Sequence, residues 1–94
     1  ITSNEPGIYF AEKYGIRIEN LMVCTEIEKN DFGQFLGFKT LTLVPFERDA
    51  IEADELSEAE RQWLNEYNAE VWKKINPYLE KEEREWLKIV TAEI

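Results

Sequence analysis

The sequence predicts an α+β fold: a small, mainly antiparallel sheet followed by two helices. Residues 15–27 are rich in β-branched residues and alternate between apolar and polar, as expected of a strand. After Ser57 the apolar residues instead recur at helical spacing. The length of 94 residues suits one small domain, and a hydrophobic content of 44% is ordinary for a folded chain.

The first half of the chain is predicted to form the strands. Residues 1–4 end a strand, and residues 5–7 form a turn because Pro6 fixes its own φ and Gly7 allows a sharp change of direction. The strand at residues 15–27 is followed by a cluster of turn-forming residues at 28–33 and by a returning strand at 34–40. This pattern predicts a β-hairpin whose loop is longer than two residues.

The second half is predicted to be helical after an irregular connection. Residues 41–46 alternate like a further extended segment, in which Pro45 marks an edge or an exit. Ser57 and Glu60 have the spacing of a capping box, Asn76-Pro77 ends the first helix, and the second helix runs from Lys81 to about Thr91. We therefore divide the chain into strands at residues 1–46 and an acidic linker with two helices at residues 47–94. The apolar stripe of the first helix is predicted to be core: Trp63, Leu64, Tyr67, Val71, Trp72 and Ile75.

Charge and cysteine content restrict the classes of function. The net charge is −9, and residues 47–94 contribute most of it, with fourteen acidic and seven basic residues. Such a chain is not expected to bind nucleic acid or an anionic membrane, and no apolar run reaches the ~18 residues of a membrane helix. Cys24 is the only cysteine, so no internal disulfide can form and we expect a cytoplasmic location. Its apolar neighbours predict a buried, structural thiol.

Three charged residues near the N-terminus are the candidate functional residues. Pro6 biases Glu5 towards an extended backbone, and strand alternation places Arg17 and Glu19 on one face. If the two segments pair, the carboxylates of Glu5 and Glu19 can converge, and either Arg17 or a bound cation would compensate their charge. From the residues alone, a solvated strand surface is the commoner explanation, and a metal site is the alternative.

The same residues resemble a known family. The runs Glu5–Tyr9 and Tyr14–Asn20 are similar to the last metal-binding segment of the Xaa-Pro aminopeptidases, or aminopeptidase P. These enzymes belong to the creatinase/prolidase/methionine-aminopeptidase group of metallopeptidases, which has the pita-bread fold. The similarity continues through residues 35–46 and 56–65. It implies that the sheet is the C-terminal part of a pita-bread catalytic domain and that residues 47–94 are a C-terminal extension.

The resemblance also implies roles for the candidate residues. The family holds two divalent metal ions, typically manganese with cobalt or zinc as alternatives, and hydrolyses the N-terminal bond of peptides with proline at the second position. By this resemblance Glu5 is a metal ligand and the catalytic general base, Glu19 is the ligand that bridges both metals, and Arg17 supports the ligand beside it. No further cofactor-binding residue is identified.

The chain departs from the family pattern in one respect. It contains no histidine, and no aspartate precedes Glu5 to complete the family's set of two Asp, one His and two Glu. We therefore expect a C-terminal fragment of a longer enzyme, inactive and without bound metal by itself. A bared strand edge predicts self-association, most simply as a homodimer. The alternatives are a non-catalytic dimerisation or interaction module built on the Trp-rich helices, the equivalent part of a prolidase, and a pseudo-enzyme.

Overall fold

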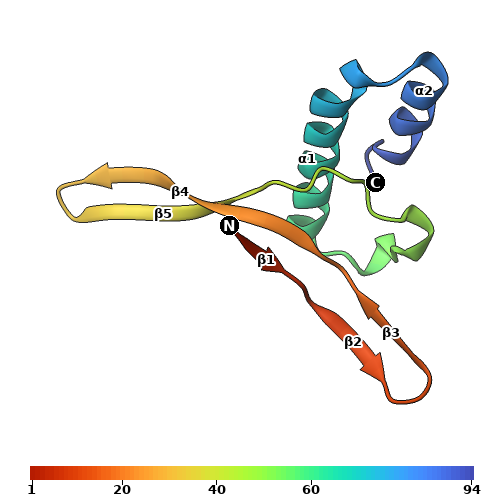
Figure 1. Cartoon of the computed structure of the whole chain (residues 1–94), viewed down its shortest axis with the longest axis horizontal. Helices are drawn as coiled ribbons and strands as arrows, with labels where there is room; N and C mark the ends of the chain where they lie inside the picture. Colours follow the sequence, from red (N-terminus) through yellow and green to blue (C-terminus); the bar gives the residue numbers. More distant parts are fainter. The chain divides into compact units, whose positions relative to one another are not determined.

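The computed structural model describes all residues from 1 to 94 and contains five strands and two α-helices (Figure 1). It divides into two compact units, Ile1–Thr42 and Leu43–Ile94. All five strands lie in the first unit and both α-helices lie in the second. The predicted α+β architecture, antiparallel strands followed by two helices, is therefore confirmed.

The first unit contains two antiparallel ladders. A three-stranded sheet has the order β1-β4-β5, and β2 pairs only with β3. The strands are β1 (Thr2–Asn4), β2 (Gly7–Phe10), β3 (Tyr14–Arg17), β4 (Asn20–Asn30) and β5 (Gly33–Thr40).

The predicted continuous strand at residues 15–27 is wrong, because the structure interrupts it at Ile18 and Glu19. The pairing of β1 with β4, which ends at Asn4↔Asn20, continues in the same register into the pairing of β2 with β3, which begins at Gly7↔Arg17. Between these two pairs, Pro6 lies opposite Ile18. The Ile18 amide donates a hydrogen bond to the Pro6 carbonyl at 3.0 Å. Proline has no N–H to return a bond, so the ladder is incomplete at this point.

The predicted long hairpin loop is also wrong. β4 and β5 are joined by only two residues, Asp31 and Phe32. The Phe32 amide donates to Asn30 Oδ1 at 2.8 Å, and Gly33 has a φ of +135°, which favours glycine. A bulge between Glu26 and Glu28 leaves Ile27 without a ladder partner, so the strands can continue to this tight turn.

Residues 41–47 form no strand, although their alternation predicts one. Leu43 and Phe46 instead pack against the core of the helical unit. The Tyr67 hydroxyl donates to the Val44 carbonyl at 2.8 Å and accepts from the Val44 amide at 3.3 Å. Burial raises the pKa of Tyr67 despite this contact with Val44. Tertiary packing thus overrides the local strand preference.

The second unit has two helices packed around a small core. α1 spans Glu58–Ile75 and α2 spans Lys81–Val90. Two 3-10 turns precede α1, η1 (Arg48–Ala50) and η2 (Ala53–Glu55), and a third, η3 (Asn76–Tyr78), lies between the two helices. The two α-helices agree with the predicted ranges. The core cluster consists of Tyr67, Val71 and Leu87, with partly buried Leu43, Phe46, Trp72, Ile75, Leu79 and Val90 around it.

Arg48 connects the linker to the C-terminal end of α2. Its guanidinium donates to the backbone carbonyls of Val90 and Glu93, each at 3.1 Å, and also to those of Ile89 and Ala92. The last carbonyls of a helix have no partner within the helix, and a cation is favourable at this negative end of the helix dipole. One side chain therefore both caps α2 and holds η1 against it.

The predicted capping box at the start of α1 is confirmed. Ser57 Oγ accepts from the Glu60 amide at 3.1 Å, and the Ser57 amide donates to Glu60 Oε1 at 2.9 Å. The hydrogen bond that the Ser57 amide donates to the Glu60 carboxylate is the main cause that lowers the pKa of Glu60 below its ordinary value, and the Ser57 side chain adds to this effect.

A pH dependence of stability follows from this lowered pKa. The carboxylate of Glu60 contributes stability above the ordinary glutamate pKa of about 4.3, and this contribution is lost as the pH falls through the lower value in the folded protein. Thermal melting of the wild type and Glu60→Gln should therefore differ most at neutral pH and converge towards pH 3. A difference in melting temperature that stays constant from pH 7 to pH 3 would contradict this assignment.

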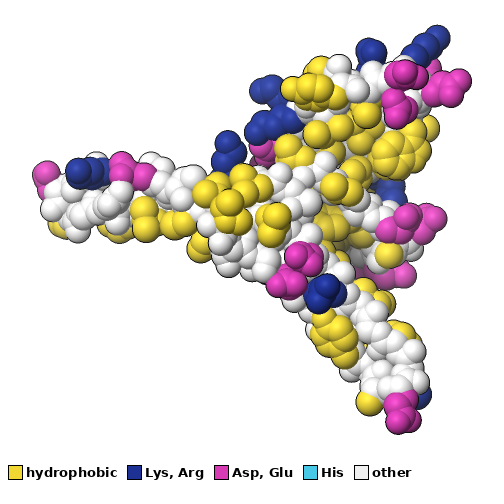
Figure 2. All heavy atoms as spheres, in the orientation of Figure 1, with side chains coloured by type: hydrophobic (Ala, Val, Ile, Leu, Met, Phe, Trp, Pro, Cys, Tyr) yellow, Lys and Arg dark blue, Asp and Glu magenta, His cyan; other side chains and the backbone are white.

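Many apolar side chains are exposed in both units, as the hydrophobic atoms in Figure 2 show. The predicted burial of the whole tryptophan stripe is wrong for Trp63, which is 49% exposed, and Trp86 at the second helix is 58% exposed. Cys24 is exposed rather than buried. Trp63, Trp86 and Cys24 belong to apolar stretches of the sequence, which is why burial was predicted for them. The 94 residues form too few helices and strands to cover every apolar face.

Candidate metal site

Strand register places the two candidate glutamates directly opposite each other. Extending the pairing Asn4↔Asn20 by one residue sets Glu5 against Glu19. The neighbouring pair, Pro6 and Ile18, carries the hydrogen bond of the ladder. In antiparallel ladders, hydrogen-bonded and non-hydrogen-bonded pairs alternate, and side chains are closer in the latter. Glu5 and Glu19 therefore occupy the position where opposing side chains approach most closely.

Arg17 lies between the two carboxylates. Its Nε atom is 3.7 Å from Glu5 Oε1 and 3.7 Å from Glu19 Oε2. Like charges directly opposite each other destabilise a sheet, and the guanidinium compensates them. The three side chains are 40–56% exposed, so the ion pairs themselves add little to stability. The structure thus brings together all three residues that the sequence singled out, at a partly solvated surface.

Ser3 is a neighbour of this site that sequence reasoning missed. Its hydroxyl donates a 2.6 Å hydrogen bond to Glu5 Oε2, the oxygen that does not face Arg17. Ser3 and Glu5 are two residues apart, and this spacing puts both side chains on the same face. The spacing alone could have suggested the contact, but only the conformation of Glu5 shows it.

Tyr9 extends the same face beyond Arg17. It pairs with Gly15, while Gly7 pairs with Arg17. A Cβ atom at Gly15 would lie 2.5 Å from Tyr9 Cδ1, and one at Gly7 would lie 2.7 Å from the Tyr9 hydroxyl. The absence of side chains at these two positions lets the Tyr9 ring lie against the backbone of β2 and β3. Alanine at either position would displace the ring from this face.

The carboxylates of Glu5 and Glu19 are suitable ligands for a divalent cation, but they can supply only part of a metal site. Two carboxylates converge on one positively charged group, and carboxylate oxygens are the ligands that hard divalent ions prefer. No group of three or more His, Cys, Asp or Glu side chains in the chain could hold a metal ion. Glu5 and Glu19 fit as two ligands of a larger set.

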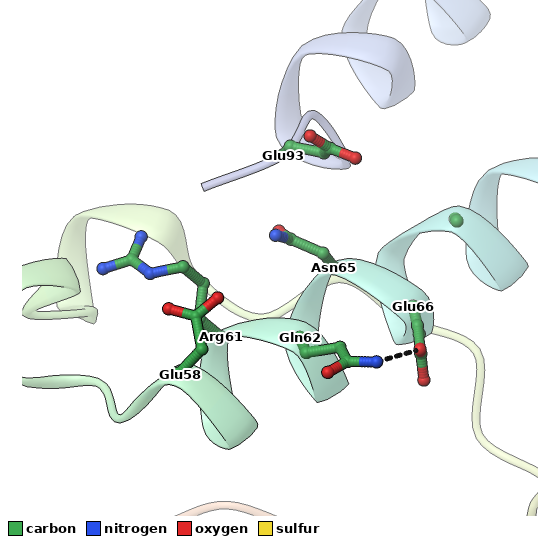
Figure 3. A pocket seen from close by; sticks show the side chains of 7 residues that line it. Glu58, Arg61, Gln62, Asn65, Glu66 and Glu93 are labelled. Carbon is green, nitrogen blue, oxygen red and sulfur yellow. Dashed lines mark hydrogen bonds between the residues drawn. The ribbon is translucent and has the colours of Figure 1, made fainter.

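The helical unit has an open hollow of about 350 Å³ along α1, which includes neither Glu5 nor Glu19 (Figure 3). Within it, Gln62 Nε2 donates to Glu66 Oε1 at 3.1 Å, and Asn65 Oδ1 accepts from the Ile94 amide at 2.9 Å. Its lining is Glu58, Arg61, Gln62, Asn65, Glu66, Ala69 and Glu93. The side chains are those of a solvated helix surface, and we assign them no chemistry.

Comparison with known proteins connects the chain to one group of peptidases. Relatives called "Probable Xaa-Pro aminopeptidase P" include proteins from Arthroderma benhamiae, 48% identical over the whole chain, and Coprinopsis cinerea, 44% identical over 98% of it. The chain spans 14% and 16% of the length of these two relatives. Neither α1 nor α2 combines the length and the apolar character that a membrane-spanning helix requires.

The fold agrees with a solved structure from the same group. The X-prolyl aminopeptidase of Caenorhabditis elegans, described as a cytosolic enzyme with a di-nuclear active site, matches 98% of this chain with a TM-score of 0.84 and 39% identity. The match covers 16% of that protein. The small antiparallel sheet and the two helices correspond to the C-terminal part of this pita-bread aminopeptidase. The family model of the C-terminal region of peptidase M24 also matches residues 34–94, about two-thirds of the chain, and the chain therefore belongs to this family.

Proposed function

We propose that this chain supplies two ligands of a dinuclear metal centre in an aminopeptidase that hydrolyses the N-terminal Xaa-Pro bond of peptides. The observation that carries the proposal is the convergence of Glu5 and Glu19 on Arg17, each at 3.7 Å, on one strand face. Membership of the peptidase M24 family and the dinuclear site of the C. elegans neighbour support it.

In this proposal the three residues have distinct roles. Glu5 binds a metal ion and accepts a proton from the attacking water, as a carboxylate can when it lies within hydrogen-bond reach. Glu19 would be the ligand that holds both metal ions, and Arg17 would hold both carboxylates in place. When bound, the two cations activate water and stabilise the negative charge that develops on the substrate carbonyl. Manganese is the proposed metal, with cobalt or zinc as alternatives.

The remaining ligands must come from outside these 94 residues. Two carboxylates cannot fill two coordination spheres, and the chain contains no histidine. We therefore propose a longer enzyme, in which residues 1–46 complete the catalytic domain and residues 47–94 form its C-terminal extension. The isolated chain is expected to be inactive and to bind Mn²⁺ weakly at most. A cytoplasmic location is proposed from the cytosolic neighbour.

A chimera tests the proposed activity. These 94 residues would replace the corresponding segment of the C. elegans X-prolyl aminopeptidase, which they match over 98% of their length. The chimera should hold two metal ions and cleave a peptide with proline at its second position, with little cleavage of the same peptide carrying alanine there. Circular dichroism and metal analysis report on folding. A folded, metal-loaded chimera that leaves the Xaa-Pro bond intact would refute the proposal.

A second function, dimerisation, is favoured by the exposed tryptophans. Trp63 and Trp86 are about half exposed, and Tyr78 and Ile89 are 86% and 70% exposed. Aromatic residues are enriched at protein–protein interfaces, so we propose that the helical unit also contributes to a homodimer. Sedimentation equilibrium of the wild type and Trp86→Gln provides the test, with Lys88→Gln on α2 as the control. A wild type that stays monomeric at high concentration would exclude self-association of the isolated chain.

A further inference from the structure

We infer that Ser3 is a positioning residue that orients the Glu5 carboxylate for metal binding. This inference rests on the proposed function of Glu5 and deepens it. The Ser3 hydroxyl donates to Glu5 Oε2 at 2.6 Å, while Glu5 Oε1 faces Arg17 Nε at 3.7 Å. Each oxygen of the carboxylate thus has its own partner.

The length of the Ser3–Glu5 contact indicates a strong hydrogen bond. Hydroxyl-to-carboxylate bonds of 2.5–2.7 Å are charge-assisted and about twice as strong as neutral ones. The donor itself lies on an ordered backbone, because Ser3 pairs with Leu21 in the ladder between β1 and β4. Ser3 is also half-buried, whereas its neighbours Thr2 and Asn4 are exposed. The ordered backbone at Ser3 therefore positions the hydroxyl that donates the hydrogen bond to Glu5.

Glu5 needs such a partner because its own structure orients the carboxylate poorly. A glutamate side chain rotates about staggered torsions, and its last torsion is broad, so an unrestrained carboxylate adopts several positions. The Glu5 side chain is 40% exposed, so its carboxylate is reached by solvent. With Oε2 engaged by Ser3, Oε1 is the oxygen that faces Arg17 and receives no hydrogen bond from Ser3, so the two oxygens of the proposed ligand have different surroundings. Groups of this kind orient metal ligands, and their loss typically weakens metal binding 10- to 100-fold.

The test uses the full 94-residue chain and needs no enzymatic activity. Proton–carbon couplings of glutamate-labelled protein report the side-chain rotamers of Glu5 without metal. Paramagnetic broadening by Mn²⁺ then reports weak binding at Glu5 and Glu19 separately. Ser3→Ala should average the Glu5 rotamers and reduce the broadening of its resonance at a given Mn²⁺ concentration by about tenfold or more. Ser3→Thr, which keeps the hydroxyl, should behave like the wild type, and so should Thr2→Ala on the opposite face of β1.

The outcomes separate this inference from the proposed function. Unchanged Glu5 rotamers and unchanged Mn²⁺ broadening in folded Ser3→Ala would overturn the role of Ser3 and leave the metal site intact. If broadening at Glu19 survives Glu5→Gln undiminished, the two carboxylates do not share a metal site, and the inference is overturned together with the proposed function. If Mn²⁺ broadens neither residue in the wild type, because the other ligands are absent, the Glu5 rotamers of Ser3→Ala decide the role of Ser3. Equal losses in Ser3→Ala and Ser3→Thr would indicate a packing effect and also overturn the inference.

Discussion

Glu5→Gln in the chimeric enzyme is expected to lower kcat for an Xaa-Pro peptide by about 10²–10⁴-fold, the usual contribution of a general base. The amide has nearly the size of the carboxylate, but it cannot accept the proton of the attacking water. It also removes one negative charge from the pair that faces Arg17. The loss should appear in kcat more than in KM, because the substrate contacts remain.

Two further variants make this result specific. Glu28→Gln removes an exposed glutamate elsewhere on β4 and should leave kcat unchanged. Glu19→Gln should lower activity as well, and it should also reduce the bound metal, because the bridging ligand is proposed to hold both ions. A Glu5→Gln enzyme that retains activity within a factor of a few would remove Glu5 from the catalytic mechanism.

Leu87→Ala is expected to destabilise the helical unit by about 2–5 kcal/mol, the range for deleting a buried leucine side chain. Leu87 is 1% exposed and forms the core cluster with Tyr67 and Val71. The total stability of a small domain is only about 5–15 kcal/mol, so this change removes a large part of it. Urea unfolding followed by tryptophan fluorescence is a suitable measurement, because all three tryptophans lie in the helical unit.

Ile89→Ala is the matched control on the same helix. Ile89 is 70% exposed in the single chain, so at protein concentrations too low for the proposed homodimer to form, this substitution should change stability by no more than about 0.5 kcal/mol. If Ile89→Ala costs as much as Leu87→Ala, the outer face of α2 must be covered in solution. In that case the proposed homodimer is the first explanation to examine, by repeating the unfolding at several protein concentrations.

Some features of the fold could be predicted because they depend on neighbours in the sequence. The start of α1 follows from Ser57 and Glu60, which form the capping box through bonds three residues apart. Its end follows from Pro77, which has no N–H to continue the helical hydrogen bonds, although Asn76 itself keeps a helical backbone. The turn at Asp31–Phe32 uses local features of Asn30 and Gly33, but composition alone predicted too long a loop, because it does not show the register shift at the bulge between Glu26 and Glu28.

Local backbone chemistry and side-chain periodicity were enough to predict the helix limits and the residue types of the candidate site. The tertiary structure decided which residues meet. Strand register, and not spacing along the chain, places Glu19 opposite Glu5, interrupts the strand across from Pro6 and brings Ser3 to a carboxylate oxygen. It also left Trp63 and Trp86 half exposed despite their apolar character. Periodicity shows which face of a helix is apolar, but burial requires a second surface, and only the assembled fold supplies one.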